Sequence, residues 1–95
     1  MSDDITSLRV QVHGFVQGVG FRDFLVMAAQ AQKLDGWVRN RSDGSVEALA
    51  IGAPHQIAAL IEACRQGPHG ARVTAVTIAD AEDDGSRGFG ALPTG

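Results

Sequence analysis

The residues best suited to chemistry form a glycine-rich segment, residues 13–20, followed almost at once by Arg22. Three of these eight residues are glycines, so the backbone can turn tightly and approach another group closely. A loop that opens a helix presents unpaired backbone N–H groups, and the helix dipole adds partial positive charge there. The guanidinium of Arg22 can hold two oxygens of one phosphate in a fork that lysine cannot form. These residue types indicate either an anion site or a loop with a purely structural role.

Two common phosphate motifs do not fit this loop. A P-loop needs Gly-Lys-Ser/Thr at the helix start, whereas Gly20 is followed by Phe21 and Arg22. The dinucleotide fingerprint needs a third glycine where Asp23 stands. The histidines show no paired ligand spacing, and the one cysteine, Cys64, lies in the apolar stripe of an expected helix. We therefore expect no nucleotide, no metal and no other cofactor.

The loop lies between an expected strand and an expected helix. Residues 5–12 alternate, with Leu8, Val10 and Val12 on one face, which is the period of a half-buried strand. From Phe21 onward, apolar residues recur three to four apart and alanines favour a helix, with Gly36 as the expected terminator. We assign Trp37, Phe21, Phe24, Val10 and Val12 to core or near-core packing.

The second half of the chain repeats this alternation of strand and helix. Residues 36–41 and 46–51 predict two strands joined by an Asp-Gly hairpin turn, and a helix follows from Pro54 to the Gly67-Pro68 pair. Residues 71–80 predict a strand, and residues 87–92 a weak last one. Pro93 and the glycines make that strand short, frayed or an edge strand. The order predicts an α+β, ferredoxin-like βαββαβ sandwich, an antiparallel sheet with two helices on one face.

Length and charge limit the possible partners. The 95 residues, 44% of them apolar, suit a single domain, 1–95, with a core over about residues 5–92. Residues 1–42 carry five basic and four acidic groups, and residues 43–95 carry three and seven, so an anion suits the first half. A net charge of −3 without tyrosine argues against nucleic acid. No apolar run could span a membrane and the start lacks a signal, so we expect a cytoplasmic protein and, without an evident extra apolar face, a monomer.

Two segments resemble the signatures of the acylphosphatase family. Residues 12–22, Val-His-Gly-Phe-Val-Gln-Gly-Val-Gly-Phe-Arg, resemble the first signature, and residues 36–46, with Gly52 after them, resemble the second. The similarity runs from about residue 5 to residue 79. Phe15 departs from it, because the family usually has an arginine there, and residues 87–95 lack the expected Phe-x-Ile/Val-Arg ending.

The resemblance implies a ferredoxin-like fold and metal-independent hydrolysis of acyl phosphates to carboxylate and inorganic phosphate. It assigns phosphate binding to Arg22 and orientation of the attacking water to Asn40. It places the phosphate-binding loop at Phe15, Val16, Gln17, Gly18, Val19, Gly20 and Phe21. Two alternatives stay open: a module that binds phosphate or another small anion without turnover, and a carbamoyl-phosphate-handling module like those at the start of larger maturation enzymes. The chain ends at residue 95 without a further domain, which favours a free-standing enzyme.

Overall fold

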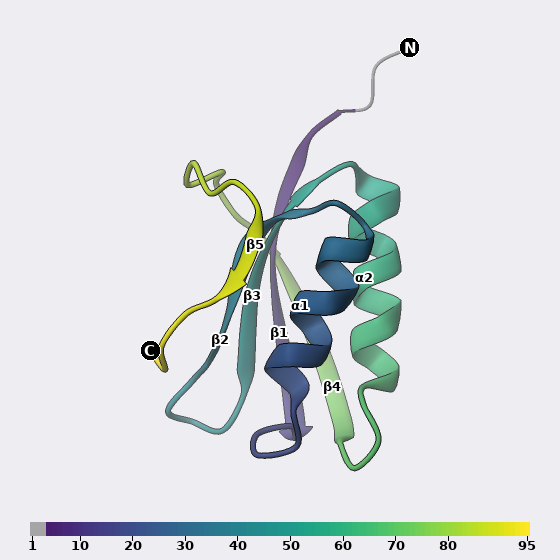
Figure 1. The fold of residues 1–95 in the computed structure, drawn as a ribbon, viewed down its shortest axis with the longest axis vertical. Helices are drawn as coiled ribbons and strands as arrows, with labels where there is room; N and C mark the ends of the chain where they lie inside the picture. Colours follow the sequence, from purple (N-terminus) through teal and green to yellow (C-terminus); the bar gives the residue numbers. More distant parts are fainter. Residues whose placement is uncertain (1–3) are drawn as a thin grey trace.

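A computed structural model describes residues 4–95, which form five strands and two helices (Figure 1). In chain order the elements are β1 (Thr6–Phe15), α1 (Phe21–Ala31), β2 (Asp35–Asn40), β3 (Val46–Gly52), α2 (Pro54–Gln66), β4 (Arg72–Asp80) and β5 (Phe89–Ala91). Residues 1–3 of the predicted domain lie outside the described part. Within residues 4–95, neither helix is long and apolar enough to cross a membrane.

The strands form one sheet in the order β4-β1-β3-β2-β5. The pairs β1–β4, β1–β3 and β2–β3 are antiparallel, and the short β5 runs parallel to β2. Both helices lie on one face of this sheet (Figure 1). The predicted ferredoxin-like α+β fold is therefore confirmed, and so is the prediction of a short last strand at an edge.

The core lies between the helices and the sheet. Alternate residues of the central strands face the helices, so Val10, Val12 and Val38 are fully buried together with Leu25 of α1. Full burial of such side chains stabilises the fold by roughly 1.5–3 kcal/mol each. Cys64 is also buried, as predicted, and burial raises the pKa of its thiol to about 12. The thiol therefore stays protonated at neutral pH and has a packing role.

Strand β1 is longer than predicted. His13, Gly14 and Phe15 were expected in the loop, but they pair with Ala75, Val73 and Arg72 of β4 across a register shift after His13. Strand β4 reaches far enough to supply backbone partners for all three residues. The loop between β1 and α1 is therefore reduced to residues 16–20, which draws its ends closer together.

Helix α1 ends earlier than predicted, at Ala31 rather than near Gly36. Lys33 takes a left-handed conformation with φ 59°, and the Leu34 N–H returns to the Ala29 carbonyl oxygen at 3.0 Å. Gly36 lies inside β2, where a Cβ would collide with the Leu49 carbonyl oxygen. The glycine thus permits close approach of two strands and does not end the helix.

Trp37 was predicted to lie in or near the core, but it is half-buried on the face of the sheet opposite the helices. It alternates with Val38, which belongs to the core. Its indole N–H donates to Asp84 Oδ2 at 3.0 Å, and the Arg39 guanidinium lies 5.0 Å from the ring centroid. These polar contacts explain why a large aromatic residue is stable there.

Candidate active site

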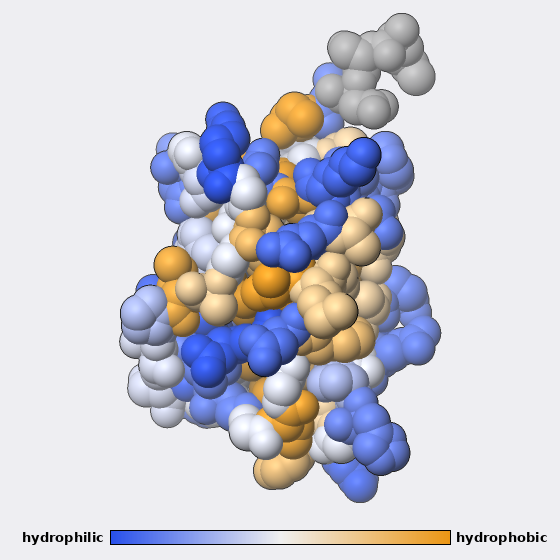
Figure 2. Space-filling view, viewed as in Figure 1, coloured by the Kyte–Doolittle hydropathy of each residue, from blue (hydrophilic) through white to orange (hydrophobic). Residues whose placement is uncertain are grey.

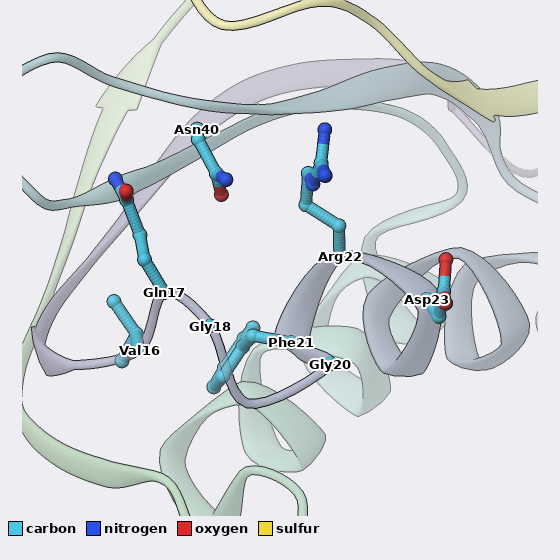
Figure 3. A pocket seen from close by; sticks show the side chains of 8 residues that line it. All are labelled: Val16, Gln17, Gly18, Gly20, Phe21, Arg22, Asp23 and Asn40. Atoms are coloured by element: carbon cyan, nitrogen blue, oxygen red, sulfur yellow. The ribbon is translucent and has the colours of Figure 1, made fainter.

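The glycine loop and the end of β2 enclose a small pocket (Figure 3). The fold brings the two together because β1 and β2 both pair with β3, so the loop after β1 lies beside the end of β2. The pocket is lined by residues from the loop, the first turn of α1 and β2: Val16, Gln17, Gly18, Gly20, Phe21, Arg22, Asp23 and Asn40.

The pocket contains most of the predicted site residues. Arg22 and Asn40 both line it, together with five of the seven predicted loop residues. Phe15 does not line it, because it belongs to β1, where it is 62% exposed. Val19 does not either, since it packs partly against the hydrophobic core. Asp23 is an additional lining residue, but its carboxylate lies on the far side of Arg22 from Asn40 (Figure 3).

The shape of the loop depends on two glycines. Gly18 has φ 75° and Gly20 has φ 78°, in the left-handed region that side chains other than glycine rarely adopt. Gly20 is also the N-cap of α1, so no capping side chain occupies the helix start. The space in front of the first turn is therefore open to a ligand.

The backbone of this segment has unpaired hydrogen-bond donors. Within residues 4–95, no acceptor faces the N–H groups of residues 17–23. The Phe24 N–H is the first with a partner, and it donates to the Gly20 carbonyl oxygen at 3.0 Å. Unpaired N–H groups at a helix N-terminus, together with the helix dipole, suit an anion.

The two side chains predicted to carry the chemistry are also free. Among the described residues, neither the Arg22 guanidinium nor the Asn40 amide has a hydrogen-bond or ion-pair partner, and both lie on the same side of the loop (Figure 3). The backbone of Asn40 is held in place, because it pairs with Val46 and its carbonyl oxygen accepts from the Gly95 N–H at 3.0 Å. The site thus combines a fixed frame with polar groups that a ligand can engage.

The arginines on either side of Asn40 are bound to a carboxylate that the sequence did not single out. Glu47 is only 4% exposed, and its carboxylate accepts from Arg39 Nε and Arg41 Nη1, each at 2.9 Å, and lies 3.2 Å from Arg9 Nε. Burial alone would raise the pKa of Glu47, but the hydrogen bonds from Arg39 and Arg41 outweigh it and lower the pKa. The hairpin register, which places Arg39 opposite Glu47, was the available signal.

Comparisons with known proteins show the family of the chain. The chain matches the Acylphosphatase family model over residues 8–91. It is 52% identical over 79 residues to an acylphosphatase of Rhodopseudomonas palustris (strain BisB5), covering 83% of this chain and 80% of the relative. The crystal structure of acylphosphatase from Bacillus subtilis superimposes with a TM-score of 0.88 at 38% identity, covering 94% of this chain and 99% of that one.

The same fold also occurs as a small part of a longer protein. Full-length HypF, solved in a phosphate- and nucleotide-bound form, matches with a TM-score of 0.91 at 26% identity, over 99% of this chain and 13% of that chain. The family and enzyme class predicted from the sequence are confirmed by the family model and the curated relatives. The chain belongs to the acylphosphatase family of acyl phosphate hydrolases.

Proposed function

We propose that the chain hydrolyses the carboxyl–phosphate bond of acyl phosphates by in-line attack of water, with no metal ion and no cofactor. One observation carries this proposal: Arg22 and Asn40, whose side chains have no partner within residues 4–95, line one pocket together with a loop whose N–H groups lack an acceptor there. We assign the phosphate-binding loop to residues 16–21, and leave out Phe15 because it lies in β1.

The chemistry of an acyl phosphate matches what this pocket offers. The leaving group is a carboxylate, whose conjugate acid has a pKa of about 4, so it departs without protonation at neutral pH. A general acid is therefore unnecessary. The protein has to hold the phosphoryl group, stabilise charge on its equatorial oxygens, and place a water in line with the bond that breaks.

Arg22 and the loop carry out the first two tasks. The guanidinium binds two phosphoryl oxygens as a fork, and unpaired N–H groups of the loop and of the first turn of α1 donate to the same group. These donors are fixed before substrate arrives, so they need little reorganisation as charge develops. Asp23, with its carboxylate beyond Arg22, stays outside the reaction.

Asn40 carries out the third task. Its amide oxygen accepts a hydrogen bond from the attacking water, and its NH₂ group can donate to a phosphoryl oxygen. A neutral amide is too weak a base to remove the proton, so a phosphoryl oxygen of the substrate takes it. The water oxygen bonds to phosphorus, the bond from phosphorus to the acyl oxygen breaks, and carboxylate and inorganic phosphate leave.

We further propose that residues 1–95 act as one domain, as a monomer in the cytoplasm, with a small acyl phosphate as the partner. The exposed large hydrophobic side chains support a monomer, because they come from separate parts of the chain: Ile5, Phe15, Met27, Ile78 and Leu92. On the face seen in Figure 2, hydrophobic residues reach the surface between hydrophilic side chains. A dispersed pattern of this kind is ordinary for a monomer surface.

The direct test is hydrolysis of benzoyl phosphate by protein treated with a chelator, followed by the loss of substrate absorbance. Wild type should turn over at the same rate with and without chelator, and Arg22→Ala should be inactive. Arg65→Ala is the matched control, because Arg65 is an exposed arginine in the last turn of α2 that does not line the pocket, and it should keep full activity. A folded wild type that binds phosphate without hydrolysing benzoyl phosphate would refute the proposal and favour an anion-binding module.

A further inference from the structure

The two halves of the site are far apart in sequence, yet one side chain joins them. In the proposed function the loop holds the phosphoryl group, and Asn40 lies at the end of β2. The Gln17 side chain leaves the loop and its Nε2 donates to the Arg41 carbonyl oxygen at 2.8 Å and to the Ser45 carbonyl oxygen at 2.9 Å. Both hydrogens of the NH₂ group are therefore used, and both acceptors lie in the hairpin turn that begins directly after Asn40.

The two acceptors are at the base of that turn. The Arg41 N–H donates to the Ser45 carbonyl oxygen at 2.8 Å, and the Gly44 N–H donates to the Arg41 carbonyl oxygen at 3.1 Å. Gln17 thus adds a second hydrogen bond to each carbonyl that closes the hairpin. A carbonyl oxygen has two lone pairs, so both bonds can exist together.

The other side-chain bonds of the turn come from elsewhere. Asp43 Oδ1 accepts from the Ser45 hydroxyl at 2.6 Å and from the Ser45 N–H at 2.9 Å, within the turn itself. Gln11 of β1 donates to Ser45 Oγ at 3.0 Å. Among the side-chain hydrogen bonds of residues 4–95, the two from Gln17 alone connect residues 16–20 with the turn.

We propose that Gln17 is a positioning residue, whose side chain fixes Asn40 relative to the loop that holds the phosphoryl group. The inference rests on the proposed function. In-line attack requires the water on Asn40 to align with the phosphorus held by the loop, and an error of about 1 Å can cost on the order of a hundredfold in rate. The loop N–H groups stay available to phosphate, because Gln17 reaches the turn through its side chain.

The chemistry of the contact selects glutamine. A glutamate at this position has no donor and would face two carbonyl oxygens with a negative charge. An asparagine has the NH₂ group but is one methylene shorter. A methionine has nearly the same length and no donor, so Gln17→Met removes the two hydrogen bonds with little change in volume.

The first test compares turnover with phosphate binding in Gln17→Met. We expect kcat for benzoyl phosphate to fall by about 10- to 100-fold, the scale of a misplaced reacting group. The inhibition constant of inorganic phosphate should change by less than about threefold, because Arg22 and the backbone donors remain. Gln11→Met is the matched control, since it removes an amide donor to the same turn from β1 and should leave kcat within about twofold. An unchanged kcat in Gln17→Met would overturn the proposal.

The second test asks whether Gln17 acts through Asn40. In the Asn40→Ala background, Gln17→Met should have almost no further effect on kcat, because the group that it positions is gone. Equal losses in both backgrounds would overturn the proposal and assign Gln17 a role independent of Asn40. In the wild-type background, Gln17→Asn should have less than full activity, because its side chain is too short to reach the turn. Full activity of Gln17→Asn would contradict the argument from length.

A spectroscopic readout separates this inference from the proposed function. Absence of turnover by wild type would refute the proposed function alone. Even then, the NMR signals of the Asn40 side-chain amide in Gln17→Met should differ from those in wild type. The backbone N–H signals of residues 17–23 in this variant should still shift when inorganic phosphate is added. Unaltered Asn40 signals would overturn the positioning role, whatever the activity.

Discussion

Two regions of this molecule contain arginines, and they differ in whether those arginines have a partner within the protein. Around Glu47, three arginines share one buried carboxylate. At the glycine loop, Arg22 has no ion pair within residues 4–95, and seven successive backbone N–H groups there lack an acceptor. The first region is satisfied by the protein itself, whereas the second is complementary to an anion that the protein does not supply.

The comparison indicates how to recognise the functional arginine. Arg39 and Arg41 lie on either side of Asn40 and are close to the site in sequence, but both are paired with Glu47. Their guanidinium groups are held at Glu47 and do not line the pocket, so they are less available to a phosphate than the free Arg22. Proximity in sequence is therefore a poorer guide than the absence of an internal partner.

The largest effect should come from Arg22. Arg22→Ala should lower kcat/KM by on the order of 10³–10⁵, the range for arginines that stabilise a transferring phosphoryl group. Arg22→Lys should be nearly as damaging, because it keeps the charge and loses the fork. Steady-state kinetics on benzoyl phosphate measures both. A lysine variant with most of the wild-type activity would show that charge alone suffices.

The next effect should come from Asn40. Asn40→Ala should lower kcat by on the order of 10²–10³, the scale of removing a preorganised polar group. Thermal unfolding should be little changed, since the Asn40 side chain has no partner among the described residues. Parallel measurements of kcat and the unfolding midpoint test this. A large fall in the midpoint would instead assign Asn40 a structural role.

Substitutions in the region around Glu47 should change stability rather than turnover. Glu47→Gln should lower the free energy of unfolding at pH 7 by roughly 1–3 kcal/mol, the value of hydrogen bonds to a charged group. The folded-state pKa of Glu47 is lowered, so its stabilising effect is present above its ordinary value of 4.5 and is lost as the pH falls through the folded value. In urea titrations, the free energies of unfolding of wild type and Glu47→Gln should therefore become equal below that pH.

An equal stability gap at acid and neutral pH would contradict the role of the Glu47 carboxylate. Turnover provides the second check on this region. In Glu47→Gln and Arg39→Ala, kcat should stay within about fivefold of wild type, because neither side chain lines the pocket. A loss comparable to that of Arg22→Ala would remove the distinction between the two regions.

The smallest expected effect is that of pH on kcat. None of the side chains that line the pocket is a histidine or a cysteine, the residue types whose charge most often changes near neutral pH. The rate constant should therefore vary by less than about twofold over that range. A pH profile of kcat measures this. A limb near pH 6.5 would indicate that a histidine takes part.

Much of this structure was predictable, because local patterns agree with the fold. The alternation in β1, the Asp-Gly hairpin and the helix bounded by Pro54 and Gly67 all reflect local preferences of the chain. Arg22 was recognisable from the loop itself, while Asn40 required the resemblance to a family. An asparagine at a strand end has many ordinary roles, and only its place in the fold brings it to the loop.

The differences arise where tertiary contacts override local signals. Phe15 follows a glycine and was expected in the loop, but β4 offers it a partner in Arg72. Gly36 resembles a helix terminator but is needed for close strand packing. Gln17 was predicted as a residue of the phosphate-binding loop, but no pattern in the sequence shows that its side chain reaches residues 41 and 45. Contacts between distant segments are invisible to a local reading.

The most direct test of the contrast between the two regions is an NMR titration of wild type with inorganic phosphate. The backbone N–H signals of residues 17–23 and the Arg22 Nε–H signal should shift together and give one dissociation constant. The Nε–H signal of Arg39, already bound to Glu47, should stay in place. Shifts concentrated at Arg39 and Arg41, with the loop unmoved, would contradict the account.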